Sequence, residues 1–273
     1  MKVAVVEPTH GVAPHVSAAL TQAGHHSLAL AASPEDRYDI RRAVHDCDAV
    51  VYLPTDWTPD AGRHETRWVA AIVRELEGSG KRFLYLSDAS VAGPTGEDAA
   101  NEDTGLSKDS PHPWRVDNER ALAAAVWQNV HSIVLRPALL YGSSGTGLVA
   151  RLVAYADQMG EALYVGDGSA RTSTVHIDDL AALIVAALER APEGSSFFAA
   201  SGEVVTWRQV AGWVAGSRGN ACQLRSISAD VATAAGLDAD LMTTDCVVND
   251  DSPRRRLRWR PSGPPLLSPT ATA

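Results

Sequence analysis

The sequence predicts an α/β protein whose helices cover both faces of a doubly wound parallel sheet. Two observations predict this class. Short apolar runs alternate with helical segments along the first half of the chain, in the order typical of repeated strand–helix–strand units. The apolar runs also lack an alternation of polar and apolar residues, as expected for strands that are buried on both faces. Because crossovers between parallel strands are right-handed in nearly all proteins, these observations leave few topologies.

Strands and helices follow each other regularly as far as residue 135. A helix at 15–23 ends at Gly24, and a longer helix at 63–77 ends before Gly78, because glycine adopts the conformation that commonly follows a last helical turn. A polar segment at 93–113, rich in Gly, Pro, Asp and Ser, is predicted to be a loop. The predicted strands are 2–6, 26–31, 49–53, 82–87 and 132–135. The predicted helices are 15–23, 39–44, 63–77 and 115–127.

The pattern is less regular in the second half of the chain. We expect a core at 1–145 and a smaller part at 146–260 that is interleaved with the core. Pro, Ser and Thr dominate residues 261–273, which we predict to be a disordered tail. In the smaller part, the predicted helices are 148–159, 179–190 and 207–215, and the predicted strands are 174–177 and 196–200.

The composition excludes several classes of function. A net charge of -9 argues against nucleic acid or an anionic membrane surface as a partner. Cys47, Cys222 and Cys246 have no metal-type spacing and fit a reducing cytoplasm. The sequence contains no apolar run of about 20 residues and no recognisable signal peptide. We therefore expect a cytoplasmic protein without a metal, whose partner is a small-molecule substrate.

Five segments carry a family resemblance. They are Val-Ala-Val-Val-Glu-Pro-Thr-His-Gly from residue 3, Leu-Ser-Asp-Ala-Ser-Val-Ala-Gly from residue 86, Leu-Arg-Pro-Ala-Leu-Leu-Tyr-Gly from residue 135, Gly-Asp-Gly-Ser from residue 166 together with Thr-Val-His-Ile-Asp-Asp-Leu-Ala from residue 174, and Arg-Arg-Arg-Leu-Arg-Trp-Arg-Pro from residue 254. In this order they resemble the extended short-chain dehydrogenase/reductase superfamily of the NAD-dependent epimerase/dehydratase type. The resemblance implies a Rossmann-like core, a small C-terminal part that binds substrate, and a possible homodimer through the helices at 63–77 and 115–127.

The loop that binds the cofactor in this family is altered. The three glycine positions of the family fall on Glu7, His10 and Ala13, and Gly11 is the one glycine left in the loop. A helix N-terminus favours an anion, and the glycines let the backbone approach the pyrophosphate. A carboxylate at Glu7 would repel the pyrophosphate, and the His10 side chain would crowd it. We therefore expect no cofactor, and we interpret this loop either as a remodelled small-molecule site or as a surface loop.

The end of the second predicted strand also departs from the family. No Asp or Glu there would hold an NAD ribose, and no Arg follows directly to hold a 2′-phosphate. If NADP or NAD does bind, Gly11, Ser33 and Arg37 are the residues that would contact it.

The catalytic positions of the family are replaced as well. The resemblance implies a Ser or Thr, a Tyr that acts as acid and base, and a Lys that lowers the pKa of the Tyr. These positions fall on Asp88, Pro111 and Arg115. Proline carries no proton, and the chain has no Tyr between Tyr85 and Tyr141, so a shift of the alignment does not restore the motif.

The polar residues that remain predict acid/base chemistry. Asp88 ends the fourth predicted strand, in the crevice where open α/β sheets bind ligands, and burial there would raise its pKa. Arg115 is either an anion clamp or the partner of a carboxylate, Asp88 or Glu119. His112 titrates near neutral pH but is also interpretable as an exposed loop residue. Asp88 is equally interpretable as a turn cap. The predicted catalytic residues are Asp88, Arg115, Ser87 and His112.

Other residues near the predicted crevice are candidates for substrate binding. Aromatic side chains on loops, such as Trp57 and Trp114, offer a surface on which a flat ligand can stack. The family signature places Asp167 and Arg171 at the border of the substrate pocket. The predicted substrate-binding residues are Glu7, His10, Tyr52, Trp57, Ser90, Trp114, Tyr141, Asp167 and Arg171.

Three functions follow from these residues. The first is a non-redox, cofactor-independent enzyme that performs an elimination, isomerisation or cyclisation on a small molecule, of the kind used in secondary metabolism. The second is an NAD(P)-dependent oxidoreductase or epimerase with an atypical site. The third is a non-catalytic protein that senses a metabolite.

Overall fold

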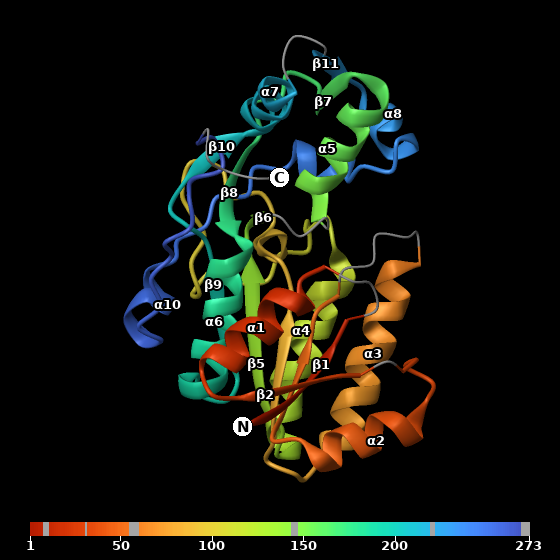
Figure 1. Ribbon diagram of the computed structural model, residues 1–273, viewed down its shortest axis with the longest axis vertical. Coiled ribbons are helices and arrows are strands. Elements are labelled where there is room, and N and C mark those ends of the chain that lie inside the picture. The colour runs from red at the N-terminus through yellow and green to blue at the C-terminus, as the bar shows by residue number, and fades with distance from the viewer. Residues whose placement is uncertain (8–10, 31, 55–59, 143–146, 219–221, 269–273) are drawn as a thin grey trace.

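A six-stranded parallel sheet forms the centre of the protein (Figure 1). The computed structural model describes residues 1–7, 11–30, 32–54, 60–142, 147–218 and 222–268. The strand order is β2-β1-β3-β4-β5-β9. The bounds are β1 (Lys2–Val6), β2 (His26–Ala29), β3 (Ala49–Tyr52), β4 (Arg82–Leu86), β5 (His131–Pro137) and β9 (Ser195–Ala199). The predicted doubly wound parallel sheet is therefore confirmed.

Helices cover both faces of this sheet. Alternate residues of β1 explain why its sequence is apolar throughout: Val3 and Val5 pack in one core cluster with α1 and α6, and Ala4 and Val6 pack in another with α2, α3 and α4. Side chains along a strand point to opposite faces, so a strand covered on both sides needs apolar residues at every position. The helix bounds are α1 (Ala13–Gln22), α2 (Arg37–Asp46), α3 (Ala61–Leu76), α4 (Pro113–Ala125) and α6 (Ile177–Arg190).

A smaller part lies at one end of the central sheet, beyond the carboxyl ends of its strands (Figure 1). It contains a three-stranded sheet of order β10-β8-β6 and a parallel pair, β11 and β7, packed around the fully buried Trp207. The strands are β6 (Leu139–Tyr141), β7 (Glu161–Val165), β8 (Arg171–His176), β10 (Val204–Thr206) and β11 (Gln223–Ile227). The helices are α5 (Gly147–Met159), α7 (Trp207–Ser217), α8 (Ala229–Ala234), α9 (Ala239–Thr243) and α10 (Asp251–Arg256).

Residues 261–268 pack against the rest of the protein. The Tyr141 hydroxyl donates to the Pro264 carbonyl at 2.6 Å, and the Asp179 carboxylate accepts from the backbone N–H groups of Ser262 and Gly263. Leu266 is fully buried. The prediction of a disordered tail is therefore wrong for 261–268, because its apolar and backbone groups find partners; 269–273 lie outside the described residues.

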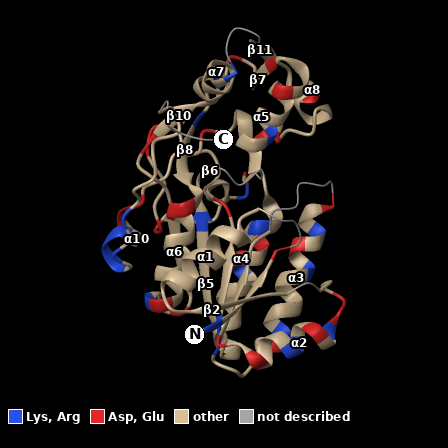
Figure 2. Cartoon of the chain, viewed as in Figure 1, with Lys and Arg blue, Asp and Glu red and all other residues tan. Residues whose placement is uncertain are grey.

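Basic side chains gather on α10, near the end of the chain (Figure 2). Arg254, Arg255 and Arg256 form the last turn of this helix, where positive charge interacts favourably with the helix dipole. Arg254 also pairs with Asp250 at 2.6 Å. In the part of the chain that the structure describes, no helix combines the length and hydrophobicity required to span a bilayer.

Candidate active site

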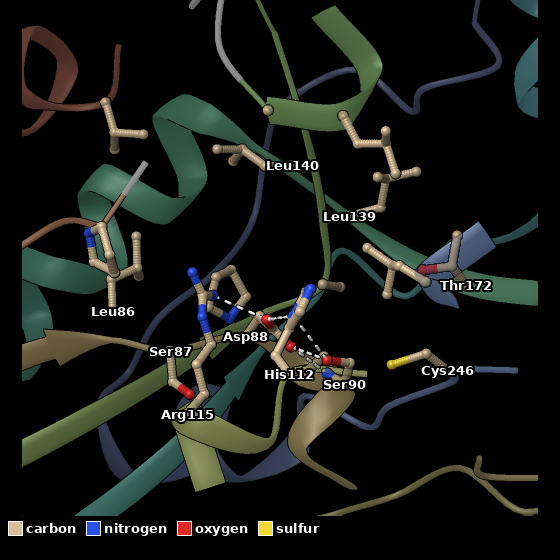
Figure 3. A pocket seen from close by; sticks show the side chains of 18 residues that line it. Leu86, Ser87, Asp88, Ser90, His112, Arg115, Leu139, Leu140, Thr172 and Cys246 are labelled. Atoms are coloured by element: carbon tan, nitrogen blue, oxygen red, sulfur yellow. Dashed lines mark hydrogen bonds and ion pairs between the residues drawn. The ribbon is translucent and has the colours of Figure 1, made fainter. Parts of the chain in front are cut away.

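A cavity opens at the carboxyl ends of β4 and β5, where open α/β sheets bind ligands (Figure 3). Its empty volume, including the open side, is about 740 Å³. Twelve of the lining residues are apolar side chains, glycine or cysteine. They come from β4, β5, β6, α5 and α9, and from segments next to α1, β3, β4 and α9. The polar lining residues are Ser87, Asp88, Ser90, His112, Arg115 and Thr172.

Asp88 is the most heavily bonded of these polar residues. Its Oδ1 accepts hydrogen bonds from the Ser90 N–H, at 2.7 Å, and from the Ser90 hydroxyl. Asp88 thereby caps the short 3-10 helix at Ala89–Ala92. Its Oδ2 accepts from His112 Nδ1 at 2.5 Å and Arg115 Nη1 at 2.9 Å. Burial by itself raises the pKa of Asp88, but the charges and hydrogen bonds of His112 and Arg115 outweigh it and hold the pKa below its ordinary value. The expected rise in the pKa of Asp88 is therefore wrong.

His112 lies between two carboxylates. Its Nδ1 contacts Asp88, and its Nε2 donates to Asp238 Oδ2 at 2.7 Å. The side chain is buried directly before α4, with its ring 4.9 Å from the ring of Trp114. Burial favours the neutral ring, but Asp88 and Asp238 together raise the pKa of His112 to about 9. His112 is therefore an imidazolium at neutral pH, and its interpretation as an exposed loop residue is wrong.

Arg115 lies between Asp88 and a second buried carboxylate, Glu65. Its Nε is 3.3 Å from Glu65 Oε1, although the geometry is not that of a hydrogen bond. Glu65 also accepts from Trp114 Nε1 at 3.1 Å and from the Tyr85 hydroxyl. Arg115 thus pairs with Asp88, one of the two predicted partners, and with a carboxylate that the sequence did not indicate.

Glu119, the other predicted partner of Arg115, forms a separate buried ion pair. Its Oε2 accepts from Arg136 Nη2 at 2.7 Å. Arg136 lies in β5, in the segment from residue 135 that carries the family resemblance. Only the structure shows that Glu119 pairs with Arg136 and not with Arg115.

Ser87 lies on the floor of the cavity beside Asp88 (Figure 3). The residue is 1% exposed, and its hydroxyl has no hydrogen-bond partner among the described residues. A buried polar group without a partner is uncommon in proteins and calls for an explanation.

Glu7 occupies the N-terminus of α1. Its carboxylate accepts the backbone N–H groups of Gly11 at 3.1 Å, Val12 at 2.7 Å and Ala13 at 3.1 Å. These are the groups that an anion bound at this helix would use. The protein thus places its own carboxylate at this end of the helix.

The model of the "NAD dependent epimerase/dehydratase family" matches residues 9–200. The chain belongs to this family. An uncharacterized protein of Schizosaccharomyces pombe is 25% identical over 244 residues, which cover 87% of this chain and 81% of that protein. A 3-diazoavenalumate denitrifying reductase of a Streptomyces species is 32% identical over 168 residues, which cover 55% of this chain and 52% of the reductase.

Two solved structures illustrate the fold that this chain shares with known proteins. Pal from Bacillus thuringiensis has a TM-score of 0.80 at 15% identity, with 97% of this chain and 95% of Pal covered. UDP-glucuronic acid 4-epimerase from Bacillus cereus, solved with UDP-glucuronic acid and NAD, has a TM-score of 0.77 at 17% identity, with 98% and 96% covered. At sequence identities of 15% and 17%, the similarity shows that the fold is shared and nothing about activity or ligands.

Several predicted substrate-binding residues of this family member lie away from the cavity. Tyr52 is buried in the core between Trp68 and Tyr85. Tyr141 is buried and bonded to Pro264, and Trp114 packs on His112 behind the cavity wall. These aromatic side chains hold neighbouring elements together, and they are not in the cavity lining.

The remaining predicted residues divide into three groups. Ser90 lines the cavity. Asp167 and Arg171 line a separate hollow, where Asp167 accepts the Ser169 N–H and Arg171 pairs with Asp245. His10 and Trp57 lie outside the described residues.

The residues named for a weakly bound dinucleotide are also dispersed. Gly11 donates its N–H to Glu7. Ser33 is exposed, and Arg37 forms an exposed ion pair with Glu75 at 3.3 Å.

Sequence reasoning missed Asp238 and Glu65. Asp238 accepts the N–H of Leu241 as the N-cap of α9, a role that its sequence position before a helix does indicate. Its contact with His112 joins residues 126 positions apart, and no local pattern indicates that contact.

Proposed function

We propose that this protein is a cofactor-independent enzyme that transfers protons to and from a small molecule in the cavity. The observation that carries the proposal is the buried relay Asp88–His112–Asp238, of which Asp88 and His112 line the cavity. Asp88 occupies the Ser position that the family resemblance gives, and His112 directly follows Pro111, which occupies the Tyr position. An imidazolium at this position supplies a proton at neutral pH, as the missing Tyr would. Eliminations, isomerisations and cyclisations need such a group and no hydride.

The residues of the relay have separate roles in this proposal. His112 stores the proton, and Asp88 and Asp238 fix the ring and stabilise its charge. The Ser90 hydroxyl lines the cavity 3.3 Å from His112 Nδ1. To carry a proton to a ligand, it would turn its hydrogen from Asp88 Oδ1 to the ligand and accept the Nδ1 proton of His112 in exchange. Arg115 balances the charge of Asp88, and this role corresponds to the second interpretation given for Arg115 from the sequence, the partner of a carboxylate.

The residues present do not fit a dinucleotide bound in the manner of the family. Such a cofactor would bring its pyrophosphate to the N-terminus of α1, where the Glu7 carboxylate already accepts three N–H groups. The two anions would repel each other, and the N–H groups of Gly11, Val12 and Ala13 would have to leave Glu7 before they could bind the pyrophosphate. Pro111 at the position of the Tyr removes the acid on which hydride transfer in this family depends.

Calorimetric titration of nucleotide-free protein with NAD, NADH, NADP and NADPH tests the absence of a cofactor. We expect no binding up to about 1 mM, since Glu7 occupies the anchoring site. A titration of a UDP-glucose 4-epimerase serves as the positive control. A dissociation constant below about 10 μM, roughly 7 kcal/mol of binding, would contradict the proposal.

A reductase is the second candidate function. It is favoured by the Streptomyces relative, which is named as a reductase, and by similar structures solved with NAD. A reductase needs a reduced dinucleotide, so the titration distinguishes the two candidates.

Proton transfer itself is measured by hydrogen exchange at carbon. We expect the protein in D₂O to accelerate deuterium incorporation next to the carbonyl of at least one small ketone, because the relay can protonate the oxygen while a base removes the neighbouring hydrogen. NMR spectroscopy follows the exchange, and His112→Gln, which lacks the imidazolium, is expected to lose it. Equal rates for His112→Gln and the unmodified protein would exclude the relay as the catalyst.

A further inference from the structure

The start of α1 lacks the residues that usually stabilise the N-terminus of a helix. The first N–H groups of a helix have no partner within the helix, and a side chain such as Ser or Asp at the N-cap commonly accepts one of them. The N-cap of α1 is Val12, whose side chain accepts no hydrogen bond, and the first turn contains no acidic residue. The helix therefore depends on another part of the chain for the partners of these groups.

Glu7 supplies these partners from outside the helix. It directly follows β1, and its Oε1 accepts the Val12 N–H at 2.7 Å. Its Oε2 accepts the N–H groups of Gly11 and Ala13, each at 3.1 Å. Backbone N–H groups that converge at the start of a helix are the arrangement by which proteins bind phosphate groups, and the positive end of the helix dipole adds to the attraction. In this protein the anion at that position is a side chain.

The contact with Glu7 helps to determine where α1 begins. Val12 is fully buried and packs in the same core cluster as Val3 and Val5 of β1. One turn further on, His15 Nδ1 lies 2.7 Å from Asp178 Oδ1, at the start of α6. The helix that Glu7 caps is therefore joined to the central sheet and to a neighbouring helix.

We propose that Glu7 is a built-in anion, which takes the structural role of a bound phosphate group at the start of α1 and closes this position to phosphate-bearing ligands. One side chain, and not the composition of the whole loop, then decides whether the helix N-terminus accepts a phosphate group. The inference goes beyond the acid/base function proposed above, since it depends neither on His112 nor on deuterium exchange. It has two testable consequences, one for stability and one for anion binding.

Glu7→Ala tests the contribution to stability. The variant removes the acceptor of three N–H groups, and we expect its Tm in differential scanning calorimetry to lie about 4 °C below that of the unmodified protein. Hydrogen exchange measured by NMR locates the effect. We expect the amide hydrogens of Gly11, Val12 and Ala13 to exchange at least about 10-fold faster in the variant. Unchanged exchange at these three amides would overturn the proposal.

Inorganic pyrophosphate tests whether the freed position accepts a phosphate group. At constant ionic strength, we expect about 10 mM pyrophosphate to raise the Tm of Glu7→Ala by about 2 °C and to leave that of the unmodified protein unchanged within about 0.5 °C. The Glu7 carboxylate accounts for the difference, because it occupies the donors and repels the anion. An equal rise in both proteins, or no rise in the variant, would overturn the proposal.

Glu7→Gln separates the charge of the side chain from its size, and it replaces Glu7→Ala if that variant does not fold. Glutamine has nearly the size of glutamate, but it is uncharged and offers one acceptor oxygen in place of two. We expect its Tm to lie between those of the unmodified protein and Glu7→Ala. A Tm equal to that of the unmodified protein would show that the charge contributes nothing, and Glu7 would then not stand in for an anion.

Asp36→Ala is the matched control. Asp36 caps α2 by accepting the Asp39 N–H at 3.1 Å, so this variant also removes a carboxylate from a helix N-terminus. Only this N–H loses its acceptor, and Asp39 keeps a negative charge in the first turn of α2. We expect the Tm to fall by about 2 °C or less and to respond to pyrophosphate as the unmodified protein does. A response as large as that of Glu7→Ala would show that any uncapped helix binds the anion, and it would overturn the role assigned to Glu7.

Discussion

Replacing His112 with alanine is expected to lower the free energy of unfolding by about 3–5 kcal/mol at neutral pH. The substitution removes the one cation that Asp88 and Asp238 share, and it leaves two buried carboxylates with a weaker set of partners. Urea denaturation followed by tryptophan fluorescence measures the change. His45→Ala is the control, since the His45 side chain is 87% exposed and its loss should cost less than about 0.5 kcal/mol. Equal stability of the two variants would show that the relay contributes nothing to the fold.

A comparison of the unmodified protein with His112→Ala at several pH values gives the pH dependence of the stability. The pKa of His112 is raised from 6.5 to about 9 in the folded state. Its stabilising contribution is therefore complete below pH 6.5 and disappears as the pH rises through about 9. We expect the unmodified protein to lose about 3 kcal/mol over this range, beyond any loss seen in His112→Ala. Parallel curves for the two proteins would contradict the charged state of His112.

Replacing Asp88 with asparagine is expected to slow deuterium exchange by about 100- to 10,000-fold. Asparagine keeps the size of the side chain but not the charge that holds His112 protonated and aligned. Exchange rates measured by NMR, with circular dichroism to confirm folding, give the result. Asp245→Asn is the control, because Asp245 pairs with Arg171 away from the cavity.

Ligand binding by Asp88→Asn distinguishes an enzyme from a metabolite sensor. We expect its affinity for a ketone that the unmodified protein exchanges to stay within about 3-fold of the unmodified protein, since asparagine keeps the size of the side chain that lines the cavity. Loss of exchange with retained binding supports catalysis. Unchanged exchange would remove Asp88 from the mechanism.

The fold was predictable from local sequence because its signals are local. Apolar runs such as that of β1 and glycines such as Gly24 and Gly78 mark strands and helix ends within a few residues. The last segment shows the limit of such signals. Pro and Ser around residues 261–268 indicate a tail, and only the partners offered by Tyr141 and Asp179 show that it is packed.

The part of the candidate site that directly follows a strand was predictable from the sequence. Ser87, Asp88 and Ser90 follow β4, so the family alignment places them together in the crevice. The buried state of His112 was not predictable, because it depends on Asp238 from a distant helix cap. Tyr52 was misplaced for a related reason: it is the last residue of β3, and the sequence does not show which side of the sheet it faces.

The place of β9 in the central sheet affects the order in which the chain can fold during synthesis. This strand pairs with β5 along Ile133–Pro137, yet it is translated about 60 residues later, after the whole of α5, β7, β8 and α6. Until it emerges, the nascent chain presents the open edge of β5, and open edges are where strands of other chains attach. A fragment that stops at residue 145 would carry this exposed edge permanently, so the central sheet is complete only in a chain that extends through residue 199.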